Sequence, residues 1–108
     1  EFKSSIEKRE LEYFLNYEIL IKNQPYRFEQ VISIFIDSFN KGGFQVEGPT
    51  CIPSNDNYII RYKISGQNKD GKEINTNLDW EVNSKKNHFK ALSDLAKSIN
   101  TEMDEGDM

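Results

Sequence analysis

The chain of 108 residues holds a single histidine, His88, and a single cysteine, Cys51. An imidazole titrates near neutral pH, so His88 could act as a general base, oriented by Asp79 or Glu81 on the neighbouring predicted strand. A histidine beside two lysines in a turn is more often a surface residue, and a lone cysteine is more often a small buried apolar one. These residues therefore favour a non-catalytic role over an enzymatic one.

Other patterns that carry chemistry are missing from the sequence. One histidine and one cysteine are too few for a typical transition-metal site. Gly42 and Gly43 lack the Lys-Ser/Thr of a phosphate-binding loop, and they follow a predicted helix where such a loop would precede one. Asp104, Glu105 and Asp107 do not follow the pattern of a calcium-binding loop. We therefore expect no metal and no cofactor.

The charge balance disfavours nucleic acid as a partner. The chain has a net charge of −4 and a pI of about 5.0, whereas nucleic-acid-binding proteins neutralise phosphates with Lys and Arg. Anionic membrane surfaces are disfavoured for the same reason. The sequence also lacks the run of about 18 apolar residues that a transmembrane helix needs.

Two stretches of alternating apolar and polar residues, Tyr58–Ser65 and Glu73–Val82, predict an antiparallel hairpin with one dry face. The loop between them contains Gly71, which can supply the positive φ of a turn. If Ile60 pairs with Trp80, Arg61 faces Asp79 on the polar side. The residues predicted on the dry face are Tyr58, Ile60, Tyr62, Ile64, Ile74, Thr76, Leu78, Trp80 and Val82.

Helical spacing of apolar residues predicts two helices before the hairpin, over residues 4–22 and 26–41. Pro25 suits the first turn of the second helix, with Asn23 as its cap, and Gly42-Gly43 ends it. Residues 44–52 resume the alternation of a strand, with a bulge expected at Gly48-Pro49. Residues 53–57 are a turn by composition.

Residues 88–100 allow two interpretations. The apolar spacing fits one helix over the whole segment, or else a short strand over residues 88–92 followed by a helix over 94–100. Ser93 would cap that helix, with Asp94 in its first turn, and this start signal favours the second interpretation.

The chain is predicted to form one domain over residues 4–100. Residues 1–3 are interpreted as a cloning-site remnant and a disordered start, which suggests a fragment of a longer protein. The segment 101–108, rich in acidic residues, is predicted to be a disordered tail.

The order of elements predicts an α+β domain: two N-terminal helices packed on a twisted antiparallel sheet of three to four strands, with a short C-terminal helix. The order of elements over residues 26–100 resembles the cystatin-like and NTF2-like superfolds. The resemblance is carried by a helix closed by Gly42-Gly43 and Phe44, followed by the strands 58–64 and 78–82. The resemblance implies that a catalytic member would need an interior Asp/His pair, as catalytic NTF2-like domains have. In this chain only Asp79 and His88 could match that pair. Domains of this shape also occur in bacterial secretion and conjugation machines.

Two functions follow from these observations. The first is a non-catalytic protein-interaction or assembly module that belongs to a larger protein of the cell envelope or of a secretion system. The edge strand of this module, near residues 44–52, would pair with a protein partner or a second copy. The alternative is a small-ligand-binding or enzymatic domain with a pocket lined by Tyr62 and Trp80. Tyr58, Asp79 and His88 complete the candidate pocket residues. Packing of the rings in a core is the competing interpretation.

Overall fold

The computed structural model describes residues 5–99, so the predictions for residues 1–3 and 101–108 lie outside the described residues. Its fold is α+β, which confirms the predicted class. In chain order the elements are α1 (Ser5–Asn16), β1 (Glu18–Ile21), β2 (Gln24–Arg27), α2 (Phe28–Lys41), β3 (Gln45–Ser54), β4 (Asn57–Gln67), β5 (Glu73–Asn83), the 3-10 turn η1 (Ser84–Lys86), β6 (His88–Ala91) and a final helix over residues 94–99.

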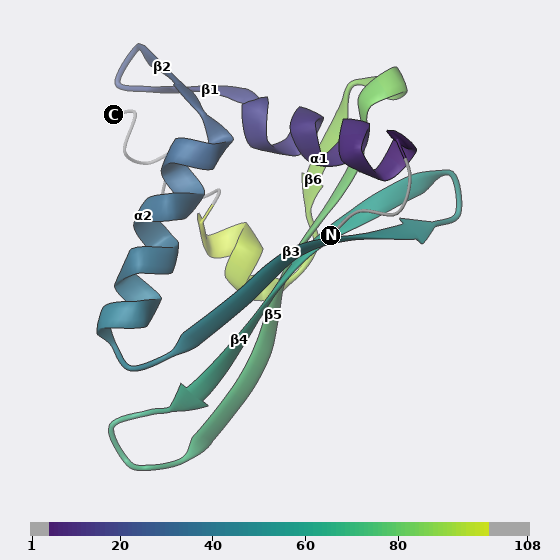
Figure 1. Cartoon of the computed structure of the whole chain (residues 1–108). Helices are drawn as coiled ribbons and strands as arrows, with labels where there is room; N and C mark the ends of the chain where they lie inside the picture. Colours follow the sequence, from purple (N-terminus) through teal and green to yellow (C-terminus); the bar gives the residue numbers. More distant parts are fainter. Residues whose placement is uncertain (1–4, 100–108) are drawn as a thin grey trace.

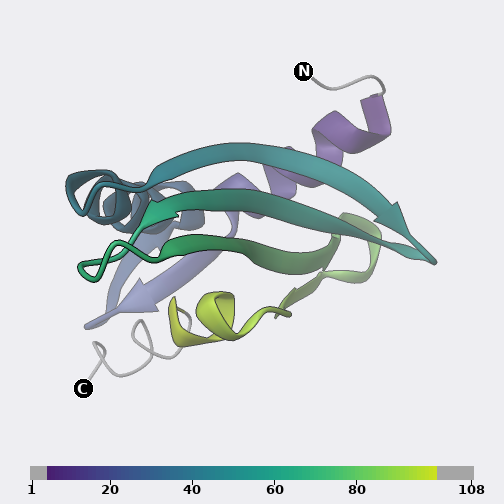
Figure 2. The same ribbon diagram turned by 90° about the horizontal axis from the view of Figure 1, so that it is seen from below.

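A four-stranded antiparallel sheet in the order β3-β4-β5-β6 forms the body of the domain, and β1 and β2 form a separate two-stranded ribbon. The strands twist strongly across the molecule, with α1 and α2 on the same side of them (Figure 1). Seen from below, the final helix lies beside the short strand β6 (Figure 2). We call the face that these helices cover the inner face and the opposite one the outer face.

The central hairpin has the predicted register, because Ile60 pairs with Trp80 and Arg61 pairs with Asp79. Successive side chains of a strand point to opposite faces, so this register sends the apolar set inward together. The buried inner-face residues of the hairpin are Ile60, Tyr62, Ile64, Leu78, Trp80 and Val82.

Both long helices reach the sheet through aromatic rings. The ring of Phe14 on α1 lies 5.3 Å from that of Trp80, and the ring of Phe28 on α2 lies at the same distance from it. The two phenylalanines also meet each other edge to face at 5.1 Å. Such pairs contribute about 0.5–1.5 kcal/mol each beyond their buried area, so this junction fixes where both helices sit.

The prediction of one helix over residues 4–22 is wrong beyond Asn16. Residues 18–21 form β1, which pairs with β2 so that Ile19 lies opposite Tyr26. The chain reverses at Lys22 and Asn23, whose φ angles of 52° and 67° suit a two-residue hairpin turn. Strand alternation and helical spacing both turn Ile21 toward the core, so this residue did not separate the two structures.

The second helix begins at Phe28 and not at residue 26. Pro25 is part of β2, opposite Leu20, and Arg27 takes the cap position that was assigned to Asn23. The backbone N–H of Arg27 donates to Oε1 of Gln30 at 2.9 Å, which satisfies a donor at the start of the helix.

The remaining predicted elements are confirmed, except that the turn predicted over residues 53–57 is confined to Asn55 and Asp56, because Pro53 and Ser54 still pair with β4. The pairing of β3 with β4 shifts between Glu47 and Thr50, which is the expected bulge. Gly48 has a φ of 126° and lies so close to β4 that a Cβ there would be 2.7 Å from the carbonyl oxygen of Arg61. In the last segment β6 is a strand, and Oγ of Ser93 accepts from the amide of Ala96 at 3.2 Å, as a helix cap should.

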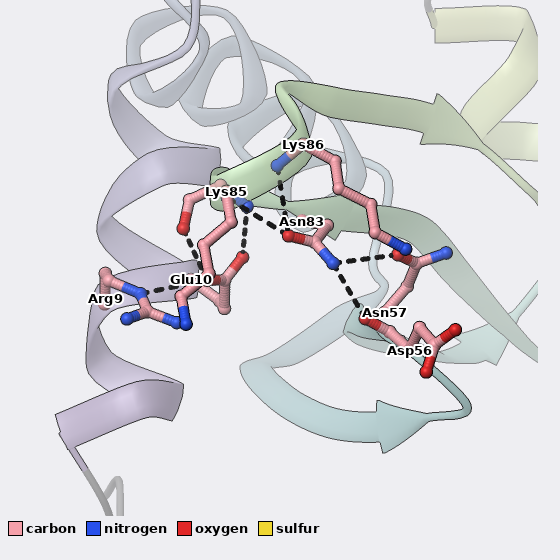
Figure 3. Close-up of polar contacts among 8 residues, drawn as sticks. Arg9, Glu10, Asp56, Asn57, Asn83, Lys85 and Lys86 are labelled. Carbon is pink, nitrogen blue, oxygen red and sulfur yellow. Dashed lines mark hydrogen bonds and ion pairs between the residues drawn. The ribbon is translucent and has the colours of Figure 1, made fainter.

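A buried carboxylate ties α1 to the far end of the sheet (Figure 3). Glu10 is fully buried, and its oxygens accept from the amide of Ser84 at 2.7 Å and from the hydroxyl of Ser84 at 2.5 Å. Nε of Arg9 donates to the same carboxylate at 3.2 Å. Beside it, the amide group of Asn83 donates to the carbonyl oxygen of Asp56 at 2.7 Å. These bonds join α1, the β3–β4 turn and η1.

We expect Glu10→Ala to lower the free energy of unfolding by about 1–3 kcal/mol, because it leaves the two donors of the partly buried Ser84 without their acceptor. Urea unfolding followed by circular dichroism measures the change. Glu12→Ala is the matched control, since Glu12 is exposed on the same helix. Equal effects of the two substitutions would contradict the assigned role of Glu10.

Candidate interaction surface

The structure divides the five predicted pocket residues between the two faces of the sheet. Tyr58, Tyr62 and Trp80 point to the inner face, where Tyr62 is 3% exposed and Trp80 is fully buried. Asp79 and His88 alternate with them and lie on the outer face. These residues therefore do not converge on one site.

The inner rings of the predicted pocket pack against other rings. Tyr62 meets Trp80 edge to face at 6.3 Å, and the ring of Phe14 lies at the same distance from Tyr62. Burial raises the pKa of the Tyr62 hydroxyl, so this group remains protonated at neutral pH. The contacts are those of a filled core.

The outer face is organised around the predicted Arg61–Asp79 pair. Nε and Nη2 of Arg61 donate to the two carboxylate oxygens of Asp79, at 2.8 and 3.2 Å. This hydrogen bonding raises the pKa of Arg61, with the Asp79 charge as a smaller cause in the same direction. The side chains are 29% and 17% exposed, so the pair is only partly open to solvent. A two-pronged bond of this kind fixes both side chains on the sheet.

His88 bonds to Glu81 and not to Asp79. Its Nε2 lies 2.8 Å from Oε1 of Glu81 on the adjacent strand. Asp79 is engaged by Arg61, and its amide donates to the Ser93 hydroxyl at 3.1 Å. The general-base arrangement expected of Asp79 and His88 is therefore absent from this geometry, although the alternative partner Glu81 does contact the imidazole.

Charges of opposite sign face each other across three rows of the outer face. The register places Glu47 opposite Lys63, Arg61 opposite Asp79, and Glu81 opposite Lys90. These rows carry three acidic and three basic side chains, so they present no field of a single sign to a polyanion or a polycation.

An apolar pair interrupts this polar face. Ile52 lies opposite Ile59, and the bulge in β3 and the alternation of β4 turn both toward the outer face. Both side chains are only partly buried. Neither residue was among the predicted site residues, although Ile59 alternates with the inward-facing residues of its strand and therefore stands out as apolar on the polar side. An apolar centre within a polar rim is the usual composition of a protein contact surface.

β3 is an edge strand, as expected, since β4 is its neighbour at one end of the sheet order. Part of its backbone therefore faces away from the sheet. Pro49 and Pro53 lack an amide donor, and a bulge interrupts the regular pairing between Glu47 and Thr50. Addition of a partner strand along the whole length of β3 is thus disfavoured.

Cys51 lies opposite Ile60 on the inner face and is half-buried. Burial, followed by the charges of Glu7 and Glu10, raises the pKa of its thiol to about 11. The thiolate is the nucleophilic form, so this cysteine is poorly suited to catalysis at neutral pH.

Within residues 5–99 no three His, Cys, Asp or Glu side chains gather where they could hold a metal ion. In the same range, each helix is too short or too polar to cross a membrane. Comparison of the chain with protein-family models, curated proteins and solved structures found no match.

We predict that iodoacetamide alkylates Cys51 slowly at pH 8, because little of a thiol with a pKa of about 11 is ionised there. The rate should rise as the pH approaches 11 and should increase strongly on unfolding in urea. Mass spectrometry of the alkylated protein measures it. A rate at pH 8 equal to that of the unfolded chain would contradict the described burial.

Proposed function

We propose that this domain is a non-catalytic protein-interaction or assembly module and that the outer face of its sheet is the contact surface. One observation carries the proposal. The inner face is filled by rings, with Trp80 fully buried, whereas Glu47, Thr50, Lys63 and Lys90 remain exposed on the outer face. The pocket lined by Tyr62 and Trp80 stays a prediction that no contact in the structure favours.

The composition of the outer face supports this proposal. Ile52 and Ile59 provide apolar area to bury, and the surrounding rows of opposite charge can align a partner and exclude wrong ones. The Arg61–Asp79 bond holds the central charges in place before binding, which lowers the entropy lost on association.

A shallow hollow adds shape to one end of the same face. It has a volume of about 350 Å³, and the side chains that line it include those of Glu47, Lys63, Ser65, Asn75 and Asn77. Such groups can donate and accept hydrogen bonds with an inserted partner side chain. The hollow therefore favours a specific protein contact over a flat, nonspecific one.

The resemblance to cystatin-like and NTF2-like domains and the setting in a larger cell-envelope or secretion-associated protein are part of the same proposal. They rest on the order of helix and antiparallel strands from Phe28 to residue 99. The β1–β2 ribbon between the helices was not part of the pattern on which the resemblance was based.

Ile59→Lys tests the proposed surface, with Ile34→Lys as the matched control. Ile34 is 66% exposed on α2, in the layer of helices on the opposite side of the sheet. Light scattering across protein concentration measures self-association, and affinity capture followed by titration of the purified pair measures other protein partners. We expect a complex that Ile59→Lys weakens by about tenfold or more and that Ile34→Lys leaves unchanged.

Thermal unfolding of both variants ensures that the comparison concerns folded protein. A complex equally tolerant of both substitutions would place the contact elsewhere. A chain that remains monomeric and captures no protein would refute the proposed function.

A further inference from the structure

A groove of about 430 Å³ lies where α1 ends and β1 begins, beside the turn that precedes β6. Figure 1 shows the β5–β6 connection alongside α1. The groove belongs to neither face of the four-stranded sheet and played no part in the proposed contact surface. Its lining residues are Tyr13, Asn16, Tyr17, Glu18 and Asn87.

The groups around this groove favour a positive charge. The carboxyl end of a helix carries a partial negative charge, and basic side chains in the last turn commonly neutralise it. α1 has no basic residue in its last turn, and Glu18 adds a carboxylate two residues after the helix ends. None of the lining residues is a lysine or an arginine. Arg27 lies opposite Glu18 on the neighbouring strand, outside the lining.

Two phenol rings give the groove an aromatic wall. The ring of Tyr17 stacks on Phe89 with centroids 4.0 Å apart, which fixes its plane. Tyr13 meets Tyr17 edge to face at 5.8 Å. The Tyr13 hydroxyl is buried without a hydrogen-bond partner among the described residues. Aromatic faces attract cations, and a carboxylate beside them attracts the same charge.

Arg27, the basic residue opposite Glu18 on β2, bonds to Glu29 and also to the lining residue Asn16. Nη2 of Arg27 lies 3.3 Å from Oε1 of Glu29, and its Nη1 donates to Oδ1 of Asn16 at 3.1 Å. The contact of Arg27 with Asn16 also shows that a guanidinium fits at the rim of this groove.

We propose that the groove binds a guanidinium group, supplied by an arginine side chain of a protein partner. The proposal rests on the proposed function, since it names the chemistry of one contact that a partner makes. Glu18 would accept the charge-assisted hydrogen bonds, and the planar cation would lie against the tyrosine rings. An acidic chain with a net charge of −4 also attracts a basic partner at long range.

The probe for the test is N-acetyl-arginine amide, titrated into the folded domain while amide NMR signals are recorded. N-acetyl-citrulline amide is the matched control, because it has nearly the same shape and no charge. We expect arginine amide to shift the signals of Asn16, Glu18 and Asn87, and citrulline amide to leave them in place. Glu18→Gln should weaken binding by about tenfold, whereas Glu12→Gln on the exposed side of α1 should not.

Equal shifts with arginine and citrulline amides, or no saturable shift with either, would overturn the proposal. A response that survives Glu18→Gln unchanged would do the same. The measurement needs no partner, and Ile59→Lys should leave it unaffected. Loss of the guanidinium site is therefore distinguishable from failure of the proposed contact on the outer face.

Discussion

The contact of Phe14 and Phe28 with Trp80 is the constraint on which the rest of the structure depends. Each helix brings one ring to the same indole, at 5.3 Å, and the two rings touch each other. Because Trp80 pairs with Ile60 and Ala91 on the neighbouring strands, this junction lies in the middle of the sheet. It decides which face the helices cover and which face remains for other molecules.

Along each strand, residues that face the helices alternate with residues that face solvent. On β5, Leu78, Trp80 and Val82 are fully buried, whereas Asp79 and Glu81 between them bond to Arg61 and His88. The polar residues that first suggested chemistry are thus paired across strands, in contacts that hold side chains in position. Because the interior is filled, the proposed function lies on a surface.

Strand alternation made the hairpin predictable, down to the pairing of Arg61 with Asp79, because a one-residue slip would have exposed every inner ring. The strand over residues 18–21 was not predicted, because helical and strand spacing both turn Ile21 inward. Glu10 was missed because a carboxylate is seldom buried, although its position four residues before Phe14 placed it on the apolar side of α1. The groove beside Tyr17 joins segments about 70 residues apart, and no local pattern encodes such a meeting.

Quenching of Trp80 fluorescence by iodide tests most directly whether the inner face is covered, because Trp80 is the single tryptophan of the chain. With its side chain fully buried, emission should be shifted to the blue, and quenching should be far weaker than in the chain unfolded by urea. The same experiment on Phe14→Ala should show increased quenching, since that ring covers the indole. Red-shifted emission with quenching equal to that of the unfolded chain would contradict the helix-covered core and, with it, the assignment of the outer face to partners.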